Sequence, residues 1–526
     1  TNITDEIIDA AFKYFPKEVQ GETIQIIKKK LQGRRRNLQK IADNYFNHIN
    51  KFQVIKGTDK DDWFEIDRLP NGQTKITAYR IKKGEKEAIF HQRTYKHSQT
   101  KEIWIYGLDD KDMFIVKGTG KNLIKLRIIG GQNKDTYNII NGKKVKIYDH
   151  KTKKNTFVTN NGDIKLTDDY ETNVYNYKKL KNNANSLTPL IGFNPDDGFK
   201  IGLSNTYTTN GFERNPFTSQ HNISGAYYFA TNGFELNYAS EFANIISHWN
   251  LGFNAMYTSP NYAINFFGYG NNTVNLEADE TKEKDYNRVK IRKLIAGSFM
   301  QWKGDLGAEI KLGINYQSFK IDKNLNRFIA TQPVDFNSQD FLNAEASYSF
   351  ENTDNPAFTT MGMKTELHVG YTANLSKNNK FAYVIPSISF NYKLAASGQL
   401  VFATKFKGHF TYGNDFEFYQ GANLGANNGL RGYRNERFTG KDAFYHSSDI
   451  RLNLTRLKTS LLPLHIGIYG GFDYGKVWLD TNNSKKWNTS VGGGIFFNAA
   501  NMTTANLSAF NSNDGLRIAF AMGFNF

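Results

Sequence analysis

The 526-residue sequence contains no cysteine. This absence excludes a disulfide-bonded scaffold, thiol catalysis and a zinc site with cysteine ligands. Long hydrophobic runs are also missing, and none approaches the ~18 apolar residues of a membrane-spanning helix. The hydrophobic content of 39% still allows a membrane β-barrel, because lipid-facing and lumen-facing residues alternate along each of its strands.

Aromatic residues and glycine are abundant, with 41 Phe, 29 Tyr and 44 Gly. The last twelve residues alternate without error, so that every second position is large and apolar and the others are small or polar. The apolar positions are Leu516, Ile518, Phe520, Met522, Phe524 and Phe526. This period of two predicts a strand with one apolar face, which suits a terminal strand exposed to lipid.

Similar alternation recurs from Leu187 onward, and Asn232-Gly233 marks a tight hairpin turn. Tight turns alternate with longer polar loops such as 271–287 and 322–339, an asymmetry typical of outer-membrane barrels. Counting to the end gives roughly fifteen to seventeen strands. We therefore predict an all-β dominated membrane protein whose residues 187–526 form a transmembrane antiparallel β-barrel of about 16 strands.

The amino-terminal third differs in charge and texture. Residues 1–186 hold 37 Lys or Arg against 23 Asp or Glu, a net charge of +14, whereas residues 187–526 have a net charge of +3. Apolar residues at helical spacing predict helices over 1–50, the first capped by Thr4, and short strands follow in a basic β-rich domain over 51–186. The basic surface fits phosphorylated lipid headgroups, acidic client proteins or simply solvent, and we expect no nucleic acid because no binding signature accompanies it.

A weak repeat runs through this basic domain. A glycine is followed five residues later by aspartate and then by a strand containing an aromatic residue, at Gly57/Asp62, Gly107/Asp112 and Gly130/Asp135. We interpret each copy as a turn whose aspartate binds backbone amides before an aromatic that packs inward. Stacked units of this kind predict a small β-solenoid or a sandwich. Calcium binding is the weaker alternative, because lysines (Lys111 and Lys134) stand where ligand oxygens are needed.

A long glycine-rich loop, 413–444, separates two predicted barrel strands and contains Leu430, Arg431, Gly432 and Tyr433. This Leu-Arg-Gly-Tyr run resembles the tip of the sixth extracellular loop in the BamA/TamA superfamily of outer-membrane assembly and secretion barrels. The segments around Asp473 and Asp449 resemble the acid-containing wall strands of the same superfamily. The resemblance implies sixteen strands, and a loop that folds into the lumen so that its Arg bonds to an acidic wall residue.

Strand parity gives independent support for an acidic partner. Large apolar residues on either side of Asp473 and of Asp449 share the opposite face of their strands, so both carboxylates should point into the lumen. We predict Asp473 as the partner of Arg431, with Asp449 second. The alternative is that Arg431 is a solvated loop residue.

The resemblance implies a barrel in the outer membrane of a Gram-negative bacterium, with residues 1–186 in the periplasm. The expected function is insertion, assembly or translocation of client outer-membrane or secreted proteins, in contact with outer-membrane lipids and with accessory lipoproteins or other assembly subunits. The alternative is a passive channel, or an anchor or exporter for an attached domain. A weakly paired seam between the first and last strands would act in the assembly mechanism.

The amino-terminal third departs from BamA, because it shows helices first and strands after, with no repeated POTRA unit. The chain is thus more similar to a divergent Bacteroidota-type branch, in which a calcineurin-like metallophosphatase domain can precede the barrel. It begins at Thr1, which fits a processed form or the tail of a longer protein. We find no catalytic constellation and no metal-ligand cluster in the sequence, and we expect no enzyme activity and no cofactor.

Overall fold

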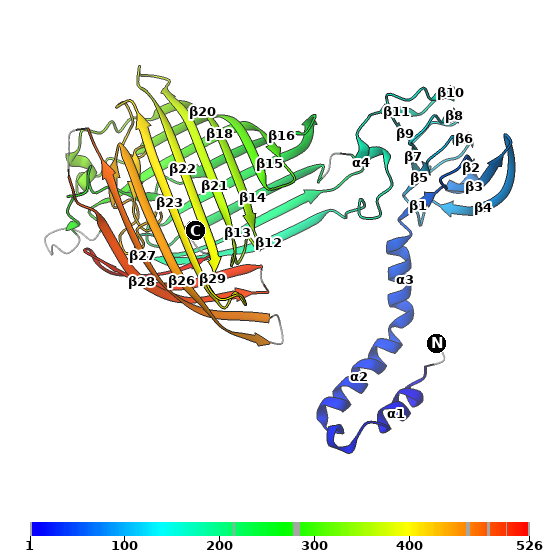
Figure 1. Ribbon diagram of the computed structural model, residues 1–526, viewed down its shortest axis with the longest axis horizontal. Helices are drawn as coiled ribbons and strands as arrows, with labels where there is room; N and C mark the ends of the chain where they lie inside the picture. The colour runs from blue at the N-terminus through cyan, green and yellow to red at the C-terminus, as the bar shows by residue number, and fades with distance from the viewer. Residues whose placement is uncertain are drawn as a thin grey trace. The chain divides into compact units, whose positions relative to one another are not determined.

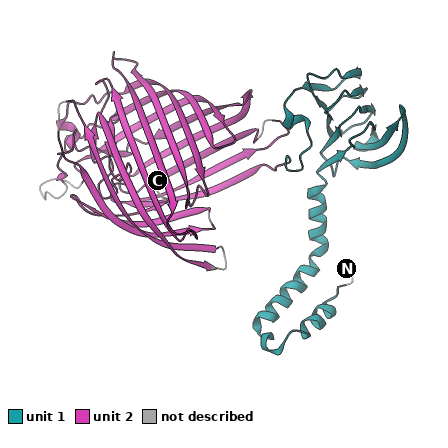
Figure 2. Ribbon diagram, in the orientation of Figure 1, with its two compact units in different colours: residues 1–180 teal, residues 181–526 magenta. Residues whose placement is uncertain are grey.

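The computed structural model describes residues 3–213, 216–276, 285–458, 463–480, 484–500 and 502–523. The chain divides into two compact units, Thr1–Leu180 and Lys181–Phe526 (Figure 2). Within the described ranges, no helix is both long enough and apolar enough to cross a membrane.

Unit 1 begins with three helices, α1 (Asp5–Lys13), α2 (Glu22–Arg36) and α3 (Leu38–Ile49) (Figure 1). Thr4 caps α1, because its hydroxyl oxygen accepts a hydrogen bond from the Ile7 amide at 3.3 Å. Acidic residues of α1 then pair with α2: the Arg35 Nε lies 2.9 Å from Asp5. These contacts hold α1 against α2.

The rest of unit 1 is built from two sheets. Successive strands alternate between a five-stranded sheet, in the order β1-β5-β7-β9-β11, and a six-stranded sheet, in the order β10-β8-β6-β2-β3-β4. The strands are β1 (Phe52–Lys56), β2 (Asp62–Leu69), β3 (Gln73–Lys82), β4 (Glu85–Lys96), β5 (Glu102–Leu108), β6 (Met113–Gly118), β7 (Lys125–Gly131), β8 (Thr136–Ile139), β9 (Val145–Asp149), β10 (Thr156–Asn160) and β11 (Asp163–Leu166), followed by the short helix α4 (Tyr170–Asn173). Neighbours within each sheet are parallel, apart from the antiparallel β2-β3-β4 part. The region is therefore a small β-solenoid into which the antiparallel strands β3 and β4 are inserted after β2.

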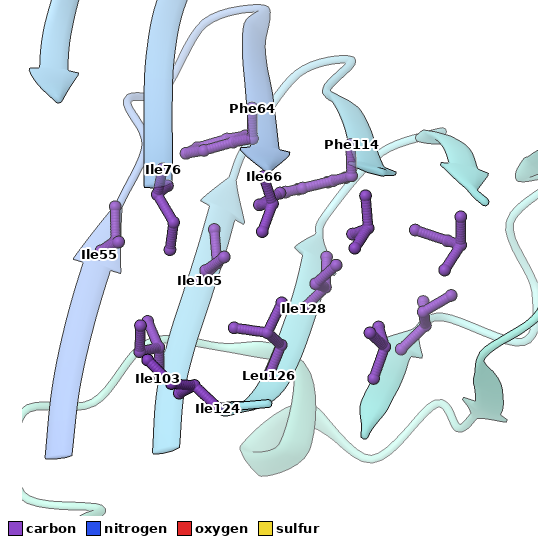
Figure 3. Close-up of a cluster of buried hydrophobic side chains, with 14 of the residues drawn as sticks. Ile55, Phe64, Ile66, Ile76, Ile103, Ile105, Phe114, Ile124, Leu126 and Ile128 are labelled. Carbon is purple, nitrogen blue, oxygen red and sulfur yellow. The ribbon is translucent and has the colours of Figure 1, made fainter. Parts of the chain in front are cut away.

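The glycine-aspartate-aromatic repeat lies at the corners of this solenoid. The Asp62 amide donates to the Asp112 carboxylate at 2.8 Å, and the Asp112 amide donates to Asp135 at 2.8 Å. The aromatic residue of each copy packs inside: the rings of Phe64 and Phe114 stack at 5.0 Å, and those of Phe114 and Tyr137 at 5.3 Å. Figure 3 shows Phe64 and Phe114 among the aliphatic side chains that fill the space between the two sheets.

The buried aspartates should make unit 1 sensitive to pH. Burial, reinforced by neighbouring carboxylates, raises the pKa of Asp112 to about 9 and that of Asp135 to about 8. Because the folded-state pKa lies above the model value of 3.8, the stabilising contribution is fully present below that value and is lost progressively as pH rises to the folded-state pKa of about 8 to 9. We expect the urea midpoint of unit 1, followed by Trp63 and Trp104 fluorescence, to fall between pH 5 and pH 9.

Asp112→Asn should flatten this dependence, because the amide oxygen still accepts the Asp62 bond and no charge forms at high pH. At pH 9 the urea midpoint of Asp112→Asn should therefore lie above that of the wild type. Asp59→Asn, at an exposed position, is the matched control. An unchanged pH profile in Asp112→Asn would show that this carboxyl does not titrate in the folded protein.

Unit 2 is a closed antiparallel β-barrel. Its strands are β12 (Ala184–Asn194), β13 (Gly198–Thr209), β14 (Ser219–Tyr228), β15 (Gly233–Ile246), β16 (Trp249–Thr258), β17 (Ala263–Asn265), β18 (Arg288–Lys303), β19 (Ala308–Ile321), β20 (Gln339–Thr353), β21 (Gly362–Asn374), β22 (Lys380–Lys393), β23 (Leu400–Tyr412), β26 (Asp442–Lys458), β27 (Pro463–Trp478), β28 (Asn488–Ala499), β29 (Thr503–Ser512) and β30 (Gly515–Met522). The short β17 pairs with the beginning of β18, and β16 pairs with the remainder, so these two strands share one place in the wall. The 17 strands thus occupy 16 positions, and the predicted fold class is confirmed.

The barrel begins at Ala184, three residues before the predicted start at Leu187. Its outer surface is apolar: Ile201, Leu203 and Ile223 are each about half exposed. Polar residues such as Asn222 point the other way, and this amide donates to Ser204 and Thr206 on the neighbouring strand. The period-two pattern of the sequence therefore separates a surface suited to lipid from a polar lumen.

Candidate functional site: the inward loop and the barrel seam

The loop that connects β23 to β26 turns into the barrel. It contains a short hairpin of β24 (Ala422–Leu424) and β25 (Phe438–Gly440). Apolar loop residues pack with wall residues in one buried cluster: Ala422, Leu424, Leu430, Tyr433, Phe438, Ala443, Tyr445 and Val477. Gly429 has φ +91, and a Cβ there would lie 2.2 Å from the Tyr445 ring. A larger residue at this position would force the loop away from the wall.

Arg431 lies between two wall carboxylates. Its Nη2 is 2.6 Å from Asp473 Oδ1 and its Nη1 is 2.7 Å from Asp449 Oδ1. The Arg431 backbone amide also donates to Asp473 at 3.0 Å, and Ser490 donates its hydroxyl to the same carboxylate at 2.7 Å. Both carboxylates are fully buried. This is the type of desolvated, multiply hydrogen-bonded ion pair that fixes a loop in one position.

The surroundings of Arg431 complete its binding site. The guanidinium lies over the ring of Phe510 at 4.1 Å, and Arg451 provides a second cation at 3.4 Å from Asp449. Two arginines therefore balance two aspartates in the lumen. A Cβ on Gly471 would come within 2.5 Å of Asp449 and 2.6 Å of Arg431, so only glycine leaves space for the pair.

The next residues of the loop bind both sides of the seam, a feature that the sequence reasoning missed. Arg434 pairs with Asp196, in the turn between β12 and β13, and Asp196 lies 3.4 Å from Arg517 of the last strand. Arg437 Nε is 2.6 Å from Asp514, in the turn between β29 and β30. From the sequence, Asn194-Pro-Asp-Asp-Gly198 is only a tight turn, and nothing local connects it to residues 238 positions away.

The first and last strands meet over a very short distance. β12 pairs with β13 along all of Ala184–Asn194, and β30 pairs with β29 over Gly515–Met522, but among the residues that the structure describes β12 and β30 share the single pair Phe193↔Phe520. The seam residues Leu516 and Ile518 are 66% and 49% exposed, while Phe520 and Met522 are half-buried. Phe524 and Phe526 lie outside the described residues. The backbone edges of the two strands are thus largely unpaired with each other.

Across the described parts of the chain, no cluster of three or more His, Cys, Asp or Glu side chains could hold a metal ion. The charged groups that come together are instead the Arg and Asp pairs of the inward loop.

Comparison with known proteins gives one family match. A family model described as "Haemolysin secretion/activation protein ShlB/FhaC/HecB" matches residues 312–497, a range that contains Arg431, Asp449 and Asp473. This match confirms the resemblance to outer-membrane assembly and secretion barrels, and unit 2 is an outer-membrane β-barrel. No curated protein matches the chain.

Among solved structures, BamA from Haemophilus ducreyi lacking POTRA domains 1–3 aligns at 15% identity and a TM-score of 0.47, covering 65% of this chain and 70% of that one. CdiB from Acinetobacter baumannii aligns at 12% identity and a TM-score of 0.42, covering 65% of this chain and 60% of that one. CdiB from Escherichia coli aligns at 10% identity and a TM-score of 0.41, covering 64% of this chain and 63% of that one. The chain therefore spans less than two thirds of either CdiB. The closed barrel described above follows from the strand pairing.

Proposed function

We propose that this protein assists the insertion, assembly or translocation of client proteins at the outer membrane, through the seam between β12 and β30. The observation that carries the proposal is that a single residue pair, Phe193↔Phe520, joins these strands within the described part of the chain. An incoming client strand needs free backbone N–H and C=O groups, and a barely paired seam offers two such edges facing lipid. The mechanism requires no covalent chemistry.

The inward loop supports this proposal because its ion pairs fix it both to the barrel wall and to the turns beside the seam. Arg431 holds the loop against β26 and β27, while Arg434 and Arg437 bind the hairpins on either side of the seam. We propose that these ion pairs hold the two seam strands together at the end where Asp196 and Asp514 lie, while the rest of β12 remains available. The loop would then position the seam without blocking its lipid-facing edges.

The orientation of the barrel follows from its even number of strand positions. β12 begins and β30 ends at one mouth, and the longer loops, including 413–441, emerge at the other. Because longer loops face outward in such barrels, we propose that residues 1–186 lie in the periplasm. The basic solenoid there is suited to acidic clients or accessory lipoproteins.

Depletion of the protein tests the proposal against a passive channel or an anchor. We expect other outer-membrane β-barrel proteins, or a secreted client, to fall several-fold in isolated outer membranes, and to recover when the wild-type gene is supplied. Unchanged levels of all outer-membrane and secreted proteins, together with steady conductance of the purified barrel, would favour the passive channel.

A further inference from the structure

The turn between β20 and β21, residues 354–361, is built to hold one shape. The Asp354 carboxylate accepts hydrogen bonds from the amides of Thr360 and Met361 at 2.9 and 3.1 Å. The Asn355 side-chain oxygen accepts from the Ala357 amide at 2.9 Å. Lys393, on the adjacent wall, lies 3.5 Å from Asp354. These bonds close the turn on itself, so it is an ordered element rather than a loose connection.

This turn reaches a distant part of the barrel wall. β20 and β21 hold the eighth and ninth of the 16 positions, half a circumference from the seam. Yet the Phe358 ring packs 5.7 Å from that of Phe496 on β28, and Thr504 of β29 donates its hydroxyl to the Ala357 carbonyl at 2.8 Å. β28 and β29 hold the fourteenth and fifteenth positions. The turn therefore crosses the lumen to the strands beside the seam.

The turn and the inward loop meet at the same aromatic residues. Phe358 packs against the buried cluster of Tyr469, Phe496 and Phe510. Arg431, from the opposite mouth, lies over the Phe510 ring. Glycines leave room for this cluster, since a Cβ on Gly467 would lie 2.0 Å from the Phe496 ring. Two segments that enter from opposite ends thus contact one cluster on β27, β28 and β29.

We propose that residues 354–361 form an internal plug, which closes the lumen at the mouth where the barrel begins and ends and braces β28 and β29 beside the seam. Two features carry the proposal: the contacts across the lumen and the shared aromatic cluster. The plug goes beyond the proposed assembly function, because it concerns passage through the lumen whichever clients the seam serves. Transport through the barrel would require this turn to move.

Conductance of the purified full-length protein in planar bilayers tests the plug. We expect Phe358→Ala, and more strongly the replacement of residues 355–360 by glycine and serine, to raise the mean conductance several-fold and to increase flicker. The matched control is Leu306→Ala in the turn between β18 and β19 at the same mouth, where the side chain is 84% exposed. It should leave the conductance unchanged. Wild-type conductance in both plug variants would overturn the proposal.

A paired-cysteine variant, Ala357→Cys with Thr504→Cys, keeps the test independent of folding losses. The protein has no other cysteine, so oxidation should form one disulfide and hold the conductance at its low level, and reduction should raise its fluctuations. Equal fluctuations with the disulfide formed and with it reduced would also overturn the proposal. The depletion experiment measures client levels, whereas these variants are tested by conductance. Failure of the proposed function and failure of the plug proposal can therefore be told apart.

Discussion

Arg431→Ala should abolish client assembly while the barrel itself still forms. Removing the guanidinium leaves Asp473 and Asp449 buried, and Arg451, 3.4 Å from Asp449, is then the remaining cation paired with them among the described residues. Breaking a buried ion pair in this way costs about 3–5 kcal/mol, enough to displace the loop tip from the wall. Arg431→Lys should behave nearly as badly, because an ammonium cannot bond both carboxylates in the fork geometry that the guanidinium uses.

Two measurements check this expectation. Client assembly in proteoliposomes should fall to background, and the loop should become sensitive to added protease. Arg456→Ala is the matched control, since this arginine is exposed and lies on β26, the strand that carries Asp449. Full activity together with a protease-resistant loop in Arg431→Ala would exclude the anchoring role.

Locking the seam should have an effect of similar size. Phe193→Cys combined with Phe520→Cys places one cysteine on each strand at the position where the described residues of the two strands pair. Oxidation should stop client insertion, and reduction should restore it in the same sample. The chemical reason is that a covalent link closes the edges to which an incoming strand would otherwise bond.

The matched control joins two strands that are already fully paired. Ile201→Cys and Tyr227→Cys lie opposite each other on β13 and β14 and are both exposed on the outer face. Their disulfide should leave client insertion intact. Insertion that continues with the seam disulfide fully formed would exclude the seam mechanism, although the barrel and its loop would stand.

The fold was predictable because its main signal is local. Leu203 and Lys200 reveal their opposite faces through a period of two, and each barrel strand repeats this information independently. The solenoid was predictable as one of two alternatives for a similar reason, since each glycine-aspartate corner recurs in the sequence. The sequence left the strand count open because β17 is short and shares its place with β16.

The site could be predicted only in part. Parity along each strand pointed Asp473 and Asp449 inward, and the structure places Arg431 between them; the functional role of this pair stays a prediction. The bonds of Asp196 and the crossing of Phe358 were not foreseeable, because each joins segments far apart in the chain and neither leaves a local pattern. The sequence does contain one indication of close packing against the wall. Consecutive glycines at 470–471 and 492–494 leave space in the barrel wall where other segments can approach closely.

The placement of the loop's ion pairs gives the seam a direction of opening. Asp196 and Asp514 lie in turns at one end of the seam, and the loop ties both of them through Arg434 and Arg437. The opposite end, beyond Phe193 and Phe520, has no pairing between the two strands in the described residues. We therefore expect the two strands to stay together at their outer end and to separate first at their periplasmic end. New polypeptide would then enter the membrane from the periplasmic side.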